Sequence, residues 1–154
     1  MQVNQIEEIR MAHSLRAFHH ASLWEEEKHF TWLSSGLLSV QLLLFTSDKS
    51  FPGRLSLMSV VSIFGVLLSC VALRVVRREG HSFWINLKHF VAIYNEALPQ
   101  QPLALPDAQA NKDYLSLVWA FVRGKANVRD AFQVIFLGFG VAFIAIYATF
   151  VYVR

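Results

Sequence analysis

The run HHASLWEEEKHF, at residues 19–30, gathers the side chains of this chain that are best suited to chemistry. Three glutamates and three histidines lie within twelve residues, and such groups bind metal ions or carry protons. The run passes directly into apolar residues, however. It therefore poses a choice between a chemical site and the polar end of a membrane helix.

Helical spacing argues against a di-iron site in this run. Glu26 and His29 form one Glu-x-x-His pair, whereas a di-iron bundle needs this pair twice and a Glu from each of two further helices. The three long apolar blocks of the chain contain no carboxylate, and none of the six histidines lies in them. We therefore predict no metal and no cofactor, and keep a histidine-based metal or haem protein as a weaker alternative.

A second face of the same helix carries His20, Trp24 and Glu27, with His13 one heptad before His20. We expect this face to meet a neighbouring helix, or to line the cytoplasmic mouth of an oligomer. The alternative is electrostatic: Lys28 neutralises the glutamates, while the aromatic residues sit at the boundary between water and hydrocarbon.

Charge is scarce in the chain as a whole, and it is unevenly distributed. Apolar residues make up 55% of the 154 residues and charged residues 16%, whereas a soluble domain has about one quarter charged residues. Three blocks, at 30–46, 54–76 and 131–153, are almost free of charge. A transmembrane helix needs about 20 apolar residues, with about 17 as the lower limit. The fold class predicted is an all-α integral membrane protein with three transmembrane helices.

The remaining segments complete a single membrane domain over residues 1–154. The turn SDKSFPG makes the first two spans an antiparallel hairpin. The elements expected in order are a cytoplasmic or interfacial helix at 3–29, the first span at 30–46, a short outer turn at 47–53, the second span at 54–76, a cytoplasmic segment at 77–130 with an amphipathic helix at 81–98, a Pro-rich linker at 99–110 and a short helix at 113–123, and the third span at 131–153.

Two of these helices have more than one expected position. The stripe of apolar residues along 81–98 suits either a helix in the membrane interface or one packed on the N-terminal helix. The run YLSLVWAFV within 113–123 is too short to span a bilayer. We expect it to form a buried helix on the cytoplasmic side, with a re-entrant segment as the alternative.

The distribution of Lys and Arg predicts the orientation, because these residues concentrate on the cytoplasmic side. Eleven would lie on the side of the N-terminus, against three on the other side, namely Lys49, Arg54 and Arg154. We therefore expect the N-terminus in the cytoplasm, matrix or stroma and the C-terminus on the opposite side. The eleven are Arg10, Arg16, Lys28, Arg74, Arg77, Arg78, Lys88, Lys112, Arg123, Lys125 and Arg129.

Small and polar residues recur within the apolar blocks and predict helix association. Small residues four apart allow helix backbones to approach closely in lipid, and a buried amide needs a hydrogen-bonding partner. We expect these positions to form an oligomer interface or to line a pore. They are Ser34, Ser35, Ser39, Gln41, Gly65, Ser69, Gly138 and Ala142.

Other functions find little support in the sequence. It has neither a Gly-x-Ser-x-Gly motif nor a Gly-rich phosphate loop, so we predict a non-enzymatic protein. It has no dense basic patch with interleaved aromatics, so nucleic acid is not an expected partner. The single cysteine, Cys70, cannot form an intramolecular disulfide.

The arrangement of an amphipathic helix, a membrane hairpin and a cytoplasmic helix resembles that of the two-span SLATT-type membrane effectors, although the third span departs from that pattern. The resemblance implies a pore-forming assembly. Two functions are therefore expected: a homo-oligomeric membrane protein that acts as an ion channel or pore-forming effector, or an accessory subunit of a larger membrane complex. The partners expected are the lipid bilayer and either further copies of the chain or other membrane subunits.

Overall fold

The computed structural model describes residues 2–47, 52–105 and 113–153, and everything regular in these ranges is helical. Four helices follow one another along the chain. They are α1 (Gln2–Thr46), α2 (Arg54–Ala97), α3 (Tyr114–Val122) and α4 (Val128–Val153). For some residues of α1, His20 among them, the structure describes the backbone but not the side chain. The all-α fold class is confirmed.

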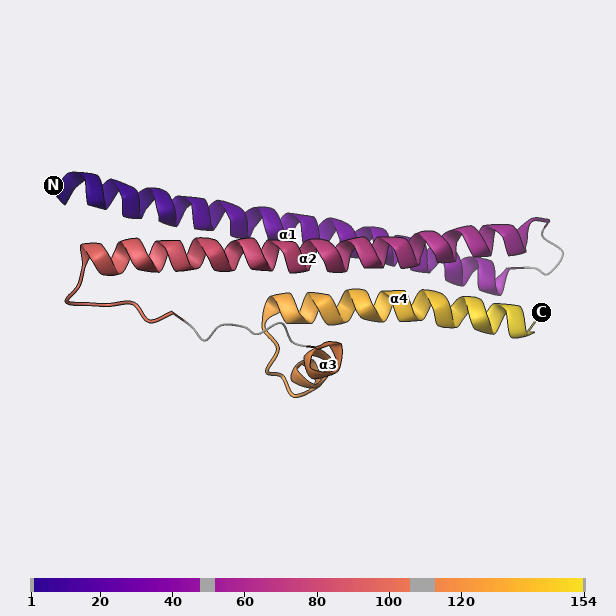
Figure 1. Ribbon diagram of the computed structural model, residues 1–154. Helices are drawn as coiled ribbons and strands as arrows, with labels where there is room; N and C mark the ends of the chain where they lie inside the picture. Colours follow the sequence, from indigo (N-terminus) through magenta and orange to yellow (C-terminus); the bar gives the residue numbers. More distant parts are fainter. Residues whose placement is uncertain (1, 48–51, 106–112, 154) are drawn as a thin grey trace.

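Two very long helices and one of ordinary length run side by side (Figure 1). α1 and α2 are antiparallel and contain 45 and 44 residues, which corresponds to about 66 Å each. α4 has 26 residues, about 39 Å, and it packs along one half of the α1–α2 pair. We call the half without α4, at residues 2–23 and 81–97, the stalk. The half with α4 is called the three-helix bundle.

α2 is one continuous helix where the sequence suggested a span followed by a separate helix. Gly80 lies at the junction, and the side chain of Arg129 from α4 occupies the space beside it. A glycine inside a helix usually costs about 1 kcal/mol relative to alanine, and here it makes room for that arginine. The helix ends at Ala97 because Pro99 disfavours a helical conformation at Leu98.

The interior of the bundle follows a heptad pattern. Buried residues of α2 recur at alternating spacings of four and three from Met58 to Val76. On α4 the buried phenylalanines are seven residues apart, and on α1 the buried residues are also seven apart. This spacing is typical of helices that cross at small angles with side chains interlocked. The residues concerned are Met58, Ser62, Gly65, Ser69, Ala72 and Val76 on α2, Phe136, Phe143 and Phe150 on α4, and Glu27, Ser34 and Gln41 on α1.

Phenylalanine rings of α4 fill the positions where α2 has small residues. A Cβ atom at Gly65 would collide with the ring of Phe143. A Cβ atom at Gly140 would lie 3.5 Å from the Cβ of Ser69. The bundle therefore alternates large and small residues across the α2–α4 contact, which allows the two backbones to approach closely.

The stalk has a small apolar core of its own. Leu87, Phe90 and Val91 of α2 are buried there and pack with Ile9 and Ala12 of α1. This contact decides between the two positions expected for the segment at 81–98. The segment packs on the N-terminal helix.

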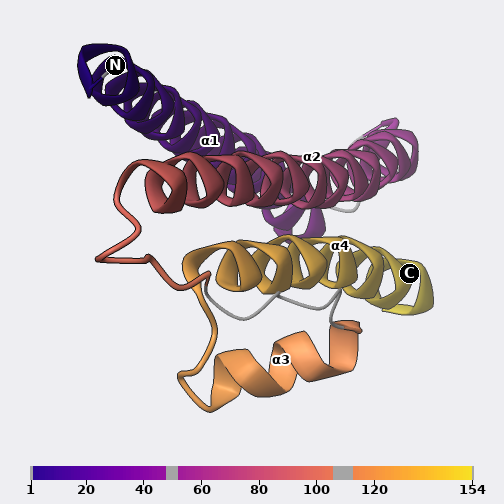
Figure 2. The ribbon, with the colours of Figure 1, turned by 60° about the vertical axis from the view of Figure 1, so that its left-hand side comes forward.

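α3 lies across the long axis of the bundle, beside the N-terminal end of α4, and it packs on α4 (Figures 1 and 2). The expectation of a buried helix is wrong. Leu117 is the one buried residue of α3, and most of its other side chains are exposed. The physical reason is geometrical, because α3 is apolar on more than one face and α4 covers one face of it.

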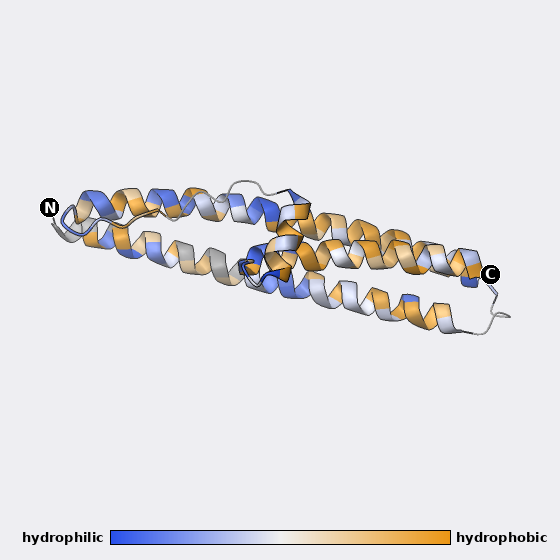
Figure 3. Ribbon diagram, turned by 90° about the horizontal axis from the view of Figure 1, so that it is seen from below, coloured by the Kyte–Doolittle hydropathy of each residue, from blue (hydrophilic) through white to orange (hydrophobic). Residues whose placement is uncertain are grey.

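Apolar residues are concentrated in the bundle and polar residues in the stalk (Figure 3). Within the described residues, two helices are long and apolar enough to cross a membrane, namely α2 and α4. The C-terminal half of α1 lies beside them (Figure 1) and includes the 17-residue block at 30–46.

The contact between Gly65 and Phe143 predicts that alanine substitutions at Gly65 and at Gly138 differ in their effect on stability. Gly65→Ala should lower the free energy of unfolding by about 1–3 kcal/mol, because the added methyl group overlaps the ring. Gly138→Ala is the matched control. Nothing lies within 4 Å of its Cβ position, so this change should be neutral or stabilising. Thermal unfolding in detergent, followed by circular dichroism, measures both, and equal shifts would contradict the packing described.

Candidate functional site

Polar side chains form a buried column along the interior of the three-helix bundle. They come from all three long helices and lie among phenylalanine, valine and alanine side chains. A buried polar group is costly unless it is hydrogen-bonded, so the partners of each group define what the column does. The buried polar residues are Glu27, Ser34, Gln41, Ser62, Ser69, Asp130 and Gln133.

Gln41 connects all three helices through one amide group. Its Nε2 donates a hydrogen bond to Ser62 Oγ on α2, at 2.8 Å, and another to the backbone oxygen of Phe143 on α4, at 2.9 Å. The Ser62 hydroxyl donates its own proton to the backbone oxygen of Met58, so its oxygen accepts from Gln41. Because both partners accept, the nitrogen of the amide must face them. The Oε1 of Gln41 then has no hydrogen-bond partner among the described residues.

The serines of the column are bonded mostly within their own helices. Ser69 Oγ donates to the backbone oxygen of Gly65 at 2.8 Å, as Ser62 does to Met58. Such back-bonding satisfies a hydroxyl in an apolar setting without a partner helix. Ser34 is fully buried, and its Oγ has no hydrogen-bond partner among the described residues.

A group of charged and polar residues closes the column at the end of the bundle that meets the stalk. Arg77 of α2 donates from Nε to Gln133 Oε1 at 3.3 Å, and its guanidinium lies 4.3 Å from the ring centre of Tyr114 on α3. Asn127 precedes α4, and its Oδ1 accepts from the backbone N–H of Asp130 at 2.7 Å. This is a typical N-cap, which satisfies one of the unpaired N–H groups at the start of a helix. α2, α3 and α4 are therefore joined at one level.

Glu27 lies at the same end of the column and is the buried member of the three consecutive glutamates. Its neighbours Trp24 and Phe30 on α1 contact the rings of Phe132 and Phe136 on α4. The side chain of Glu27 is 2% exposed, and its Oε1 has no hydrogen-bond partner among the described residues. Burial removes the carboxylate from water and raises the pKa of Glu27 from 4.5 to about 7. The group therefore changes its charge near neutral pH.

The other two glutamates point to the surface. Glu25 pairs with Lys28 at 2.9 Å, and the hydrogen bond and charge of Lys28 lower the pKa of Glu25. Glu26 is exposed, and His29 places its Nδ1 2.7 Å from the backbone oxygen of Glu25. The electrostatic interpretation of the run is thus confirmed for Glu25. It does not describe Glu27.

The residues predicted for an oligomer interface or a pore divide into three groups. Four are buried inside the chain, namely Ser34, Gln41, Gly65 and Ser69. Two are half-buried, namely Ser35 and Ala142, and two are exposed, namely Ser39 and Gly138. Trp24 is exposed in part, and its ring lies edge-on to that of Phe132, with centroids 5.7 Å apart. The side chain of His20 lies outside what the structure describes. The role of these residues in an oligomer stays a prediction.

The sequence did not predict the contacts of Arg77 with Gln133 and with Tyr114. Arg77 directly follows the second apolar block, and Gln133 lies near the start of the third. Placing the ends of these two blocks at one membrane depth would have brought the residues together. Among the described residues, no group of three or more His, Cys, Asp or Glu side chains is arranged to hold a metal ion.

The buried carboxyl of Glu27 predicts a characteristic dependence of stability on pH. Between pH 4.5 and about 7 the folded chain keeps a proton that the unfolded chain has released. Stability therefore falls as the pH rises through this window and levels off above it. Glu27→Gln should remove this slope and raise the free energy of unfolding above pH 7 by up to about 3 kcal/mol.

Thermal unfolding in detergent over a pH series measures the effect. Glu26→Gln is the matched control, because Glu26 is the exposed neighbour in the run. The slope should survive in that variant. A slope that also survives in Glu27→Gln would contradict the assignment.

No family model, no curated protein and no solved structure is similar to the chain. The features that bear on function are therefore the polar interior of the bundle, the apolar surface around it and the groups at the boundary with the stalk.

Proposed function

We propose that this chain is a non-enzymatic membrane protein which crosses the bilayer three times and assembles with further copies of itself. The stalk then projects into the cytoplasm, matrix or stroma, and the C-terminus lies on the opposite side. The observation that carries the membrane assignment is the largely apolar outer surface of the three-helix bundle, together with the polar side chains buried inside it.

In the bundle, buried polar side chains lie among the phenylalanines of the interior, and the outer surface is largely apolar. The interior holds the amide of Gln41 and several serines, whereas the surface exposes residues such as Phe64 and Leu67 on α2 and Ile144 on α4. Soluble proteins rarely expose apolar patches of more than a few hundred Å². In lipid the same arrangement is favourable, because the tails solvate the outer side chains and the interior hydrogen bonds hold the helices together.

The third crossing is proposed for residues 30–46 of α1. The Gln41 bonds to α2 and α4 put this segment in the interior of the same bundle. Its outer side chains include Leu33, Val40 and Leu43, which are exposed. A helix that lies beside two spans and faces lipid on its other side would cross at the same depth. The hydroxyl of Ser39 in this segment donates to the backbone oxygen of Ser35, which suits an apolar surrounding.

The proposed orientation rests on the charges at the two ends of the bundle. Arg77, Arg78 and Arg129 lie at the stalk end, while Arg54 is at the other end. Arg54 donates to the backbone oxygens of Leu44 and Phe45 at 2.8 and 2.5 Å, and so satisfies the last carbonyls of α1. An excess of basic residues at the stalk end favours a cytoplasmic stalk.

Self-assembly is proposed from an apolar stripe on the stalk. Met11 and Leu15 lie on the side of α1 that faces away from the contact of Ile9 and Ala12 with α2, and both are exposed. The stalk is the polar half of the molecule, so this stripe would face water in a single chain. A second copy in the same bilayer presents the same stripe at the same height. Pairing the two stripes removes both from water.

Ion conduction is an alternative function, and the structure favours it less than self-assembly alone. The amide nitrogen of Gln41 and the hydroxyls of Ser62 and Ser69 are buried and hydrogen-bonded within one chain, so a pore lined by these residues would require the bundle to open. An accessory subunit is the other alternative, in which a different protein covers the stripe. The assembly experiment below distinguishes it from self-assembly.

Site-directed labelling tests the topology. In a Cys70→Ser background, a cysteine at Pro52 should react with an impermeant maleimide from the outside only, and a cysteine at Gln101 from the inside only. Both positions are exposed. The two lie on opposite sides of the bilayer in the proposed arrangement, because α2 crosses between them. The reverse pattern would contradict the orientation, and labelling of both from one side would contradict the crossing by α2.

Mass measurement in lipid nanodiscs tests self-assembly. The chain should be a homo-oligomer, and Met11→Glu with Leu15→Glu should convert it to a monomer, because two charges would be buried at the interface. The control is Ala17→Glu with Ala21→Glu, which adds the same charge at exposed positions of the same helix. It should leave the oligomer intact.

Three outcomes count against self-assembly. The first is a monomer of the wild-type chain in nanodiscs. The second is an oligomer that is insensitive to the Met11 and Leu15 pair of substitutions. The third is a complex with a different protein after purification from its own membrane, which would favour the accessory subunit.

A further inference from the structure

α3 has three distinct faces, although it is only nine residues long. Tyr114, Leu117 and Phe121 recur at helical spacing on the side where Leu117 is buried against the rest of the chain. A second apolar row faces outward and is exposed. We call this row the outer face of α3, and it consists of Leu115, Val118, Trp119 and Val122.

The outer face has the spacing of an amphipathic helix, at positions i, i+3, i+4 and i+7. Leu115 is 71% exposed and Val122 is 69% exposed. The third side of the helix carries Ser116, Ala120 and Arg123, and it is the polar side. Since the inner face already accounts for the packing of α3 on α4, the outer face requires a separate explanation.

The position of α3 relates this face to the proposed membrane. The helix lies across the axis of the bundle, beside the beginning of α4 (Figures 1 and 2). That level is where the apolar half of the molecule gives way to the polar half (Figure 3). If the bundle crosses a bilayer, α3 is therefore parallel to the bilayer surface and at the depth of the headgroups, where helices with one apolar face are stable.

The end of α3 presents two basic residues beside the outer face. Gly124 has φ 66°, and the N–H groups of Gly124 and Lys125 bond to the backbone oxygens of Phe121 and Ala120 at 3.0 and 2.9 Å. This is a Schellman motif, in which the glycine turns the chain sharply at the end of the helix. The turn keeps Arg123 and Lys125 close to the helix.

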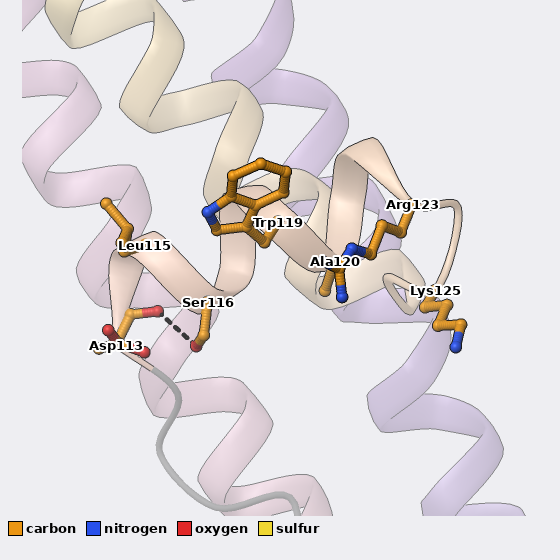
Figure 4. A pocket seen from close by; sticks show the side chains of 7 residues that line it. All are labelled: Asp113, Leu115, Ser116, Trp119, Ala120, Arg123 and Lys125. Carbon is orange, nitrogen blue, oxygen red and sulfur yellow. Dashed lines mark hydrogen bonds between the residues drawn. The ribbon is translucent and has the colours of Figure 1, made fainter.

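These residues line an open hollow of about 560 Å³ (Figure 4). The guanidinium of Arg123 lies 5.4 Å from the ring centre of Trp119 and makes a cation–π contact with it. Asp113 adds one negative charge, and Ser116 Oγ donates to the backbone oxygen of Asp113 at 2.9 Å. The net charge of the lining is positive. The hollow is lined by Asp113, Leu115, Ser116, Trp119, Ala120, Arg123 and Lys125.

We propose that α3 is a lipid-binding helix that lies in the membrane interface, with its outer face among the acyl chains. The phosphate headgroup of an anionic phospholipid then occupies the part of the hollow that Arg123 and Lys125 line. The inference rests on the proposed membrane function. Charge complementarity selects the headgroup, because Arg123 and Lys125 stand beside an apolar face. Apolar and basic groups on one short helix are the combination that binds a negatively charged membrane surface.

Tryptophan fluorescence tests the position of α3. The chain has four tryptophans, Trp24, Trp32, Trp84 and Trp119, and variants that keep one of them and have phenylalanine at the other three can be reconstituted in vesicles. Lipids brominated near the glycerol end or near the methyl end of the acyl chains quench tryptophan according to its depth. Trp119 should be quenched more strongly by the shallow bromines. Trp84, which lies in the stalk, should remain unquenched.

The variant that keeps Trp32 separates failure of this inference from failure of the membrane function. Trp32 lies in the proposed span and is exposed. If Trp32 is quenched and Trp119 is not, α3 lies in water or under another protein chain, and the inference is overturned. If Trp32 is not quenched at any depth, the membrane function itself is wrong.

The choice of headgroup has its own test on the variant that keeps Trp119. Brominated phosphatidylglycerol, as a minor component of phosphatidylcholine vesicles, should quench Trp119 about twofold more than brominated phosphatidylcholine at the same fraction. Arg123→Gln with Lys125→Gln should remove this preference and leave shallow quenching in place. Lys88→Gln, at an exposed basic position of the stalk, is the control and should retain it. Equal quenching by the two lipids in the chain with Arg123 and Lys125 intact would overturn the anionic site.

Discussion

The amide of Gln41 is the interaction on which the arrangement of the three long helices depends. In an apolar bundle there is little hydrophobic drive between helices once lipid surrounds them, so a buried amide that bonds to two neighbours gives them a specific register. Gln41 reaches Ser62 on α2 and the backbone of Phe143 on α4. The ring of the same Phe143 lies against Gly65 of α2. Hydrogen bonding and packing therefore select the same register.

The two ends of the bundle are closed by different devices, and both use arginine. At one end Arg54 bonds to the last carbonyls of α1, and its guanidinium lies 4.7 Å from the ring centre of Phe150. At the other end Arg77 meets Gln133 and Tyr114. A guanidinium has five N–H groups in a fixed plane, so one side chain can bond to backbone or amide oxygens and stack on a ring. The hydrogen bonds and ring contacts of these two residues join separate helices at each boundary.

The boundary between the bundle and the stalk also holds two glutamates in opposite environments. Glu27 has lost its water to the helices around it, while Glu25 two residues earlier keeps both water and its partner Lys28. α3 is held to the same level through Tyr114 and Arg77. In the proposed membrane, one layer of the structure therefore holds a carboxyl that titrates near neutral pH and, beside it, a helix that meets the lipid surface.

The sequence by itself determined the helical fold class, the positions of the apolar blocks and the outer ends of the helices to within a few residues, although it divided the continuous α2 into two helices. These features follow from local composition, because apolar runs, prolines and glycines act on neighbouring residues of the chain. It could not decide which glutamate of the run is buried. The sequence places Glu27 on one helical face with His13 and His20, and that spacing alone does not show where the face becomes buried. Glu27, Ser34 and Gln41 are interior because α2 and α4 cover them, whereas His13 is exposed in the stalk.

The tertiary structure also decided the environment of the small residues and of the short helix. Gly65 and Gly138 have equivalent sequence signatures, yet one lies under a phenylalanine ring and the other is open, because the partner comes from a distant part of the chain. α3 was expected to be buried from its composition. Its exposure depends on which neighbours reach it, and α4 covers only one of its faces. Local chemistry thus determined the elements, and long-range packing determined which of their faces are used.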